Sequence, residues 1–387
     1  MPSIHRTRNL SLLAAAALFG CSAKATDPSC LEADTGALPR GTVPIKVETV
    51  VSGLSVPWGI AFLPGGDWLV TERPGRIRLL SGGTLVPAPV AIVDIASNGE
   101  GGLLGIALHP DFANNSLFYV YATVDVGGEP TNRVIRYKLS TDHLTAAVDQ
   151  IILDGIPGAQ FHDGGRIRFG PDGMLYVGTG DGRVPDRSQS MSERNGKLLR
   201  LTPDGAIPTD NPFPGSPVFL LGIRNTQGFD WFDAQTLVVT DHGPSGDTDR
   251  TGHDEVNVVH AGDNLGWPDI AGCEASSGKI APVLTFTEAV PPGGAALYTG
   301  DAIPEWKGSL IVGTLRSEHL HRVAFDPQNH RRMTLHEVYL EGEPPAGKGR
   351  LREVVMGPDG ALYVTTSNCD GRGICPPDQD RILRITR

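Results

Sequence analysis

The sequence contains six copies of one short pattern, and this repeat limits the possible folds more than any other feature. Each copy is an apolar run that ends in small or hydroxyl-bearing residues, and several copies follow a tight turn such as Pro171-Asp-Gly173. Proline before Asp-Gly supplies the backbone angles of a reverse turn, so each run is expected to be a strand. The runs are Trp68–Glu72, Leu117–Thr123, Leu175–Asp181, Leu237–Asp241, Leu310–Thr314 and Leu362–Thr366.

A second run, with alternating apolar and polar residues, follows each of these. Such alternation is typical of a strand with one face in the core and one in water. One small unit cannot bury its apolar face, but six units packed around an axis can. The sequence therefore predicts an all-β, six-bladed β-propeller with about four antiparallel strands per blade. A large β-sandwich is the alternative, but it does not explain six copies. The second runs are Arg76–Leu80, Arg133–Leu139, Lys197–Leu201, Glu255–Val259, Leu320–Phe325 and Arg381–Ile385.

The small residues in the first runs suggest where those runs lie in a blade. The stretch Leu175–Gly180 is apolar and then small, which suits the innermost strand, where the blades converge on a crowded axis. Composition agrees with an all-β fold. The chain has 49 glycines and 31 prolines among 387 residues, which leaves little room for long helices, and its hydrophobic content of 40% is typical of a folded chain rather than a disordered one.

Charge and missing motifs exclude several functions. The formal net charge is −11, so a nucleic-acid partner is not expected, because phosphate contacts need a basic face. The segment Gly178–Gly182 is not a dinucleotide fingerprint, since Pro185 follows it and no helix opens there. The sequence contains neither a P-loop nor a Gly-x-Ser-x-Gly elbow. Nicotinamide and nucleotide chemistry are therefore not expected.

The first residues have the pattern of an export signal. Basic residues precede the apolar run Leu10–Phe19, and Gly20 and Cys21 follow it, so residues 1–20 are predicted to be a signal peptide. The run that ends at Cys21 resembles the bacterial lipobox, which predicts a lipidated Cys21, residues 21–44 as the lipid-anchor tether and a catalytic propeller over residues 45–387. The expected location is the periplasm, as an outer-membrane lipoprotein held to the membrane only by its anchor. Simple cleavage beside an unmodified cysteine remains the alternative.

Four cysteines remain after Cys21, and an even number in an exported protein suggests disulfides. Cys369 and Cys375 bracket a short glycine-containing turn, so they are the preferred pair. Cys30 and Cys273 are then left as the second pair. Zinc binding is not favoured, because no Cys-x-x-Cys motif occurs.

Candidate catalytic residues were sought on loops next to the predicted strands, since propeller sites lie at one mouth of the central channel. His162 lies on a glycine-flanked loop and could act as a base near neutral pH, or could only cap the backbone. Arg224 could bind an oxyanion, or could bridge two blades. Gly243 and Pro244 could offer backbone carbonyls to a hard cation, whereas the acidic stretch after them fails as an EF-hand because Val258 stands where a glutamate is required.

A basic cluster lies near the end of this acidic chain. It comprises Arg316, Lys348, Arg350 and Arg352. Several cations in one region suggest an anionic ligand with more than one carboxylate or phosphate. An ordinary solvated face is the alternative.

Taken together and in order, these segments resemble the PQQ-dependent soluble aldose/glucose dehydrogenases, which are grouped with the sorbosone dehydrogenases. The resemblance runs from about Val47 to Arg387. The segments that carry it are Leu54–Phe62, Gly101–Phe112, His162–Val177, Gly196–Arg200, Arg224–Asn225, His242–Pro244, Asp254–Glu255 and Gly262–Pro268.

The resemblance implies a six-bladed propeller and specific roles. His162 matches the general base that takes the proton of the sugar C1 hydroxyl while hydride passes to the quinone. Arg224 matches the residue that stabilises the quinone oxygen. Gly243 and Pro244 match the carbonyls that hold a catalytic Ca²⁺. The further cofactor contacts implied are Asn225, Arg316, Arg350 and Arg352.

Two departures from the family pattern bear on the substrate. Glu100 stands where the glucose enzyme has glutamine, and this extra carboxylate near the cofactor and base could raise the basicity of His162. The segment Phe286–Gly294 lacks the aromatic residues that the glucose enzyme places over its sugar, so a broader aldose range is expected.

The sequence thus predicts PQQ- and Ca²⁺-dependent oxidation of aldoses at C1 to the lactone, with electrons passed to a quinone or cytochrome. A Ca²⁺-dependent propeller lactonase is the first alternative, and it would need acidic and asparagine ligands around an axial metal. A catalytically silent propeller that binds another protein is the second, and it would lack the base or the arginines.

Overall fold

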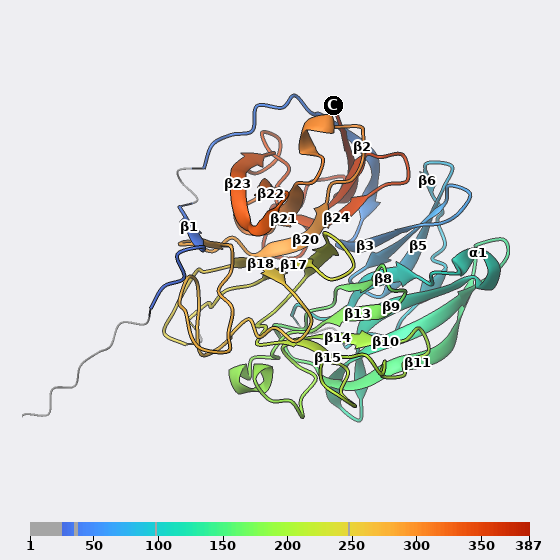
Figure 1. The fold of residues 1–387 in the computed structure, drawn as a ribbon. Coiled ribbons are helices and arrows are strands. Elements are labelled where there is room, and N and C mark those ends of the chain that lie inside the picture. The colour runs from blue at the N-terminus through green and yellow to red at the C-terminus, as the bar shows by residue number, and fades with distance from the viewer. Residues whose placement is uncertain (1–24, 35–37, 97–98, 247) are drawn as a thin grey trace, which may run out of the picture.

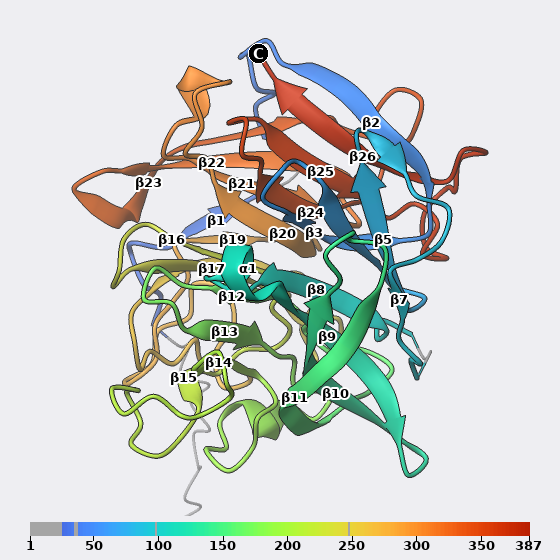
Figure 2. The same ribbon diagram turned by 90° about the vertical axis from the view of Figure 1, so that its right-hand side faces the viewer.

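The computed structural model describes residues 25–34, 38–96, 99–246 and 248–387. Six sheets are arranged around a central axis (Figure 1), and a perpendicular view shows the same ring of sheets from the side (Figure 2). Each sheet has four antiparallel strands, consecutive in the chain in five of the sheets, with short additions at the edges of two. The predicted six-bladed propeller is therefore confirmed.

The blades are numbered here in chain order from the first complete one, and the strands of each are given from the axis outward. Blade 1 has β3 (Pro57–Phe62), β4 (Trp68–Glu72), β5 (Arg76–Ser81) and β6 (Thr84–Leu85), with β7 (Ala91–Ile92) also paired to β5, and blade 2 has β8 (Leu103–Leu108), β9 (Leu117–Val126), β10 (Glu129–Leu139) and β11 (Ala146–Pro157). Blade 3 has β12 (Ile167–Phe169), β13 (Leu175–Gly178), β14 (Lys197–Leu201) and β15 (Val218–Leu221), and blade 4 has β16 (Gly228–Trp231), β17 (Leu237–Asp241), β18 (Glu255–Val259) and β19 (Leu284–Phe286). Blade 5 has β20 (Pro292–Leu297), β21 (Leu310–Thr314), β22 (Leu320–Asp326) and β23 (Asn329–Tyr339), and blade 6 has β24 (Leu351–Met356), β25 (Leu362–Thr366), β26 (Asp380–Thr386) and β2 (Lys46–Leu54). One α-helix is described, α1 (Phe112–Asn115), together with the 3₁₀ turns Pro185–Ser188 and Pro304–Trp306.

The ring is closed by strands from both ends of the chain. Strand β2 from the N-terminal part pairs with β26 near the C-terminus, and Lys46 lies opposite Thr386. Sharing one blade between distant segments removes a free sheet edge. This pairing also holds the two ends of the propeller together.

The six apolar runs form the second strand of each blade, so the expectation that they are innermost is wrong. The innermost strands are β3, β8, β12, β16, β20 and β24, which contact one another around the axis. Crowding there is met by other glycines. A Cβ on Gly105 would lie 2.3 Å from the carbonyl oxygen of Gly165, and one on Gly228 would lie 2.8 Å from the backbone of Ala295. Small residues are needed at the axis, as predicted, but on the preceding strand.

Three of the third strands, β5, β14 and β18, are buried along most of their length, which differs from the expected core face and water face, whereas β22 and β26 alternate in burial as expected. Strand β14 is buried along its whole length. Its polar side chain Arg200 is covered by the next layer and reaches outward to Asp172 and Asp210. A blade packs between two neighbours, so alternating polar residues there are buried with charged partners rather than solvated.

Part of the expected tether is attached to the propeller. Strand β1 (Leu31–Ala33) pairs in parallel with β19 and covers the edge of blade 4. Cys30 forms a disulfide with Cys273, and Cys369 forms one with Cys375, which confirms both pairings. The predicted signal peptide and Cys21 lie outside the described residues. Of the helices in the described part of the chain, none is long and apolar enough to cross a bilayer.

Candidate active site

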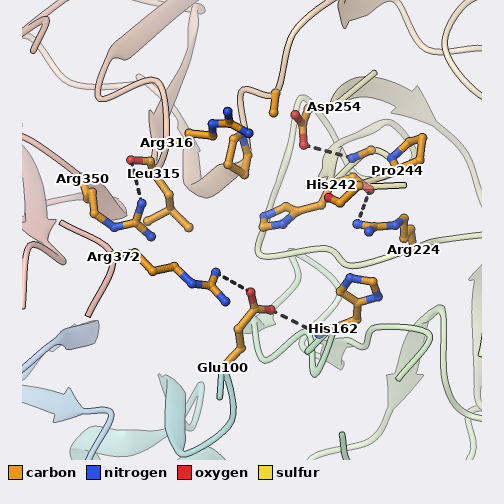
Figure 3. A pocket seen from close by; sticks show the side chains of 14 residues that line it. Glu100, His162, Arg224, His242, Pro244, Asp254, Leu315, Arg316, Arg350 and Arg372 are labelled. Atoms are coloured by element: carbon orange, nitrogen blue, oxygen red, sulfur yellow. Dashed lines mark hydrogen bonds and ion pairs between the residues drawn. The ribbon is translucent and has the colours of Figure 1, made fainter. Parts of the chain in front are cut away.

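A cavity of about 370 Å³ opens at one end of the axis. The residues that line it all precede the first strand or follow the second strand of a blade. Because these two strands are antiparallel, both kinds of loop lie at the same end of the propeller. Figure 3 shows the result, with Arg350 and Arg372 on one side of the cavity and His162 and Arg224 on the other. The fold therefore brings together loops from distant parts of the sequence.

His162 is fixed by a buried carboxylate. Its Nδ1 lies 2.7 Å from Oδ1 of Asp181, a residue with no exposed surface. Asp181 also accepts hydrogen bonds from the indole of Trp267 at 2.9 Å and from the backbone N–H of Arg183 at 2.7 Å. With Nδ1–H donated to Asp181, the lone pair of Nε2 is left as the proton acceptor.

The backbone around His162 is shaped for this position. His162 has a φ of 65°, in the left-handed region that side chains rarely adopt. A Cβ on Gly180 would lie 2.0 Å from the carbonyl oxygen of His162. The strand end that carries Asp181 can therefore approach the histidine loop only because residue 180 is glycine.

Glu100 lies next to the base, as the sequence predicted. Its Oε2 accepts a hydrogen bond of 3.2 Å from the backbone N–H of His162, and its Oε1 lies 2.9 Å from Nη1 of Arg372. Burial opposes the charge of this carboxylate, but the His242 ring, the Arg372 guanidinium and the His162 N–H together outweigh that effect and lower the pKa of Glu100. Glu100 thus places a negative charge at the cavity wall.

Arg224 lines the cavity, whereas Asn225 is buried in the protein beside it. The guanidinium of Arg224 lines the cavity, where it lies 3.5 Å from the carbonyl oxygen of His242 and over the ring of Trp267. Asn225 is fully buried beneath it and accepts a hydrogen bond from Gly164. Asn225 therefore supports the histidine loop and is not part of the cavity wall.

Asp241 holds the turn that carries these two residues. It accepts hydrogen bonds from the backbone N–H groups of Arg224 at 2.8 Å and Asn225 at 2.7 Å. Burial raises the pKa of Asp241 to about 7, although both hydrogen bonds act in the opposite direction. The next residue, His242, donates from Nε2 to the carbonyl of Pro292, and burial lowers its pKa to about 4, so its ring is neutral.

The two predicted carbonyls of Gly243 and Pro244 line the cavity. Asp254 accepts from the N–H of Gly243 at 3.0 Å and from that of Val290 at 2.6 Å, which fixes the turn. Among the described residues, no backbone hydrogen bond ends on either carbonyl oxygen. Backbone carbonyl and carboxylate oxygens are the ligand type that a hard cation such as Ca²⁺ prefers.

The basic cluster is divided between the cavity and the structure behind it. Arg316 and Arg350 line the cavity, whereas Arg352 is buried beside it. Asp370 accepts two hydrogen bonds from Arg350, at 2.8 and 3.0 Å, and lies 3.5 Å from Arg352. Burial lowers the pKa of Arg352 to about 10, so it remains charged. Arg316 is exposed.

Three important residues were missed by sequence reasoning. Asp181 is the last residue of one of the repeated runs. Its position directly after a predicted strand is the sequence signal that could have identified it as a site residue. Asp370 and Arg372 lie in the loop between Cys369 and Cys375, and that short charged loop was interpreted only as a disulfide turn. No periodic pattern connects it to Glu100, because Arg372 and Glu100 are 272 residues apart in the chain.

The acidic ligand set of the lactonase alternative is not found. Within the ranges that the structure describes, no group of three or more His, Cys, Asp or Glu side chains is placed to hold a metal ion. The silent-propeller alternative would lack the base or the arginines, and this chain keeps both. The fold and the site together define a propeller whose axial cavity is lined by His162, bonded to a buried carboxylate, and by several arginines.

Comparison with known proteins identifies the family. The sequence profile of "Glucose / Sorbosone dehydrogenase" matches residues 54–382. The chain belongs to this family of oxidoreductases, as the sequence resemblance predicted.

Three relatives show the extent of the similarity. The aldose sugar dehydrogenase of Escherichia coli strain K12 is 30% identical over 88% of this chain and 94% of its own. A putative oxidoreductase (glucose dehydrogenase) of Thermus thermophilus is 43% identical, with a TM-score of 0.80, over 88% of this chain and all of its own. The PQQ-bound aldose sugar dehydrogenase of Streptomyces coelicolor is 37% identical, with a TM-score of 0.77, over 90% of this chain and 99% of its own.

Proposed function

We propose that the protein oxidises aldoses at C1 to the corresponding lactone, with pyrroloquinoline quinone (PQQ) and Ca²⁺ as cofactors. One observation carries the proposal: His162, oriented by Asp181, faces the same cavity as Arg224, Arg316 and Arg350. The relative that was solved with PQQ bound supports the choice of cofactor.

The residues present fit both cofactors. PQQ is a tricarboxylate, and guanidinium groups bind carboxylates with paired, charge-assisted hydrogen bonds. Arg316 and Arg350 line one wall of the cavity and would hold the acidic edge of the molecule. The carbonyls of Gly243 and Pro244, held by Asp254, would contribute oxygen ligands to Ca²⁺. When bound, PQQ supplies a two-electron acceptor for the hydride that leaves C1, and Ca²⁺ polarises it.

The chain itself positions the sugar and removes the proton. Nε2 of His162 accepts the proton of the C1 hydroxyl, and the Asp181 carboxylate stabilises the imidazolium that forms. Arg224 points a fixed positive charge at the cavity, where negative charge develops on the electron acceptor. Loss of the proton from the C1 hydroxyl and of one hydride from C1 converts the aldose to the lactone.

Reconstitution tests the proposal directly. Apoprotein is loaded with PQQ and Ca²⁺, and reduction of a redox dye is followed with a panel of aldoses. His162→Ala should abolish turnover while the titration of PQQ absorbance stays close to that of the wild type. The matched control is His260→Ala, which removes an exposed histidine outside the cavity and should keep full activity. Undiminished turnover in His162→Ala would remove this base from the mechanism, and lactone hydrolysis without PQQ would favour the hydrolase.

We also propose that the protein is exported and held at the outer membrane by lipid on Cys21, from where it passes electrons to a quinone or cytochrome. The support is the sequence of residues 1–21. Cell fractionation of the full chain and of Cys21→Ala tests the anchor. The wild-type protein should sediment with membranes, and the variant should appear in the soluble periplasmic fraction. The same distribution for both would contradict lipid anchoring.

A further inference from the structure

A second cavity, of about 380 Å³, opens beside the first and shares one wall with it. The shared residues include the base His162, together with Arg224 and Arg372. Phe161 and Arg183 line only the second cavity and not the first. A ligand in the second cavity would therefore also touch the catalytic histidine.

Two guanidinium groups lie over one aromatic ring in this cavity. The Arg183 guanidinium is 5.5 Å from the centre of the Phe161 ring, and that of Arg372 is 5.4 Å from it. Both distances are within the range of a cation–π contact. The ring thus gathers two positive charges beside His162, its neighbour in the chain.

Arg183 is positioned by the same carboxylate that orients the base. Its backbone N–H donates to Oδ1 of Asp181, the atom that also contacts Nδ1 of His162. Its φ of 62° is in the left-handed region, which turns the chain sharply at this point. The backbone of Arg183 is therefore held beside the base by one buried residue.

The charge of this cavity is positive although the chain is strongly acidic. Three arginines line it, against one carboxylate, that of Glu100. Glu100 is paired with Arg372 at 2.9 Å. Among the described residues, no carboxylate lies within ion-pair distance of Arg183, whose side chain is exposed to solvent. An exposed guanidinium beside a base offers a paired hydrogen-bond site to an anion.

We propose that Arg183, with Arg372, forms a subsite for an acidic group on the sugar, so that the preferred substrates are aldoses with a carboxylate or phosphate at C6. The inference rests on the proposed function, because it places C1 of that sugar at His162. In a pyranose ring, C1 and the carbon that bears C6 are joined through the ring oxygen. One ring can therefore place C1 at the base and its acidic group at the guanidinium groups. Neutral aldoses lack the group that this subsite would bind.

The test compares acidic and neutral sugars that share one ring. For PQQ-loaded wild-type protein, kcat/KM is measured with D-glucose, D-glucuronate and D-glucose 6-phosphate. The ratio of kcat/KM for the better acidic sugar to that for glucose should exceed one. In Arg183→Gln this ratio should fall by about tenfold or more, the usual cost of losing a charge-assisted hydrogen bond. The two acidic sugars distinguish a carboxylate subsite from a phosphate subsite.

Two controls separate this effect from a general change of charge. Arg332→Gln removes an arginine whose side chain is 71% exposed and does not line either cavity, and it should keep the wild-type ratio. Higher salt should raise KM for the acidic sugar more than KM for glucose, because screening weakens only the charged contact. A ratio of one or below in the wild type, unchanged in Arg183→Gln, would overturn the inference while leaving the proposed function intact.

A binding measurement gives a result that does not depend on turnover. Calorimetric titration of D-glucuronate into protein whose bound PQQ has been reduced beforehand, so that no turnover follows, should show binding that is lost in Arg183→Gln and kept in Arg332→Gln. Absence of binding to the wild type overturns the subsite. Loss of PQQ affinity in Arg183→Gln without a change in sugar preference also overturns it, because Arg183 would then serve the cofactor. Failure of every sugar to reduce the dye would contradict the proposed function, and the titration would still decide the subsite.

Discussion

Asp181 and His162 form a hydrogen bond of 2.7 Å between Oδ1 and Nδ1, at the point where blade 3 meets the axial cavity. The same carboxylate accepts from Trp267, whose ring lies under the guanidinium of Arg224. One buried residue thus connects the base to the cation on which the proposed mechanism also depends. A carboxylate with three donors is held in one orientation, and this in turn fixes the imidazole.

Asp181→Asn should reduce kcat/KM by about a hundredfold or more, because an amide stabilises neither the tautomer with a proton on Nδ1 nor the imidazolium. The measurement is steady-state dye reduction with a neutral aldose. The melting temperature and the PQQ titration serve as controls, since the amide keeps the shape of the carboxylate. Activity within threefold of the wild type would show that His162 does not need this partner.

Arg316 and Arg352 should respond differently to removal, although both belong to the basic cluster. Arg316→Gln changes an exposed side chain, so its melting temperature should stay unchanged while PQQ affinity falls about tenfold. Arg352→Gln removes a buried cation beside Asp370, which should lower the free energy of unfolding by about 3 kcal/mol. Chemical denaturation and PQQ titration of both variants check this contrast. Equal effects of the two changes on stability would contradict it.

The two disulfides should differ in what they stabilise. Cys30 and Cys273 are 243 residues apart, and Cys369 and Cys375 are 6 apart. Loop-closure entropy predicts that removing the first costs about 5 kcal/mol and the second about 2 kcal/mol. The short loop carries Asp370 and Arg372, so the double serine variant of Cys369 and Cys375 should also weaken PQQ binding.

Chemical denaturation and PQQ titration of both double serine variants test this. The variant without the Cys30–Cys273 bridge should be the less stable of the two but should bind PQQ normally. Normal PQQ binding by the variant without the short bridge would show that Asp370 and Arg372 keep their positions without it.

The repeat made the fold and much of the site predictable from sequence. The turn and strand patterns recur six times, and His162, Arg224 and the Gly243–Pro244 carbonyls lie on loops at the same end of the blades. These signals are local, because the position of a loop before or after a predicted strand decides at which end of the propeller the loop lies. The sequence placed the repeated runs on the innermost strands, but they are the second strands of the blades. Glycine is needed wherever two backbones approach closely, so it occurs on second strands as well as on first strands and does not identify the innermost one.

The remaining parts of the site depend on contacts between distant segments. Asp370 pairs with Arg350, just before β24, and with Arg352 on β24, and Arg372 pairs with Glu100, which is 272 residues earlier in the chain. Asn225 was expected at the cofactor, but it is buried, and Asp241 accepts hydrogen bonds from its backbone N–H and from that of Arg224. No single stretch of sequence contains both members of such pairs, so composition and spacing could not predict them.

A buried histidine pair in blade 5 should make the protein sensitive to acid. Nδ1 of His321 lies 3.0 Å from Nε2 of His336. Burial lowers the pKa of His336 to about 4 and holds that of His321 well below its usual value. The unfolded chain therefore binds more protons than the folded chain below the ordinary histidine pKa of about 6.5. Stability should be fully present above that pH and should fall as the pH drops toward 4.

His336→Gln should reduce this loss, because glutamine keeps a polar partner for His321 but does not titrate. The wild type should lose on the order of 3 kcal/mol more than the variant between pH 7 and pH 4, which corresponds to the lowered pKa of one histidine. Urea unfolding at several pH values measures the difference. His260→Gln, at an exposed position, is the matched control and should follow the wild-type curve. Parallel curves for the wild type and His336→Gln would show that acid acts on other groups, since the buried pair could not then be the main site of proton uptake on unfolding.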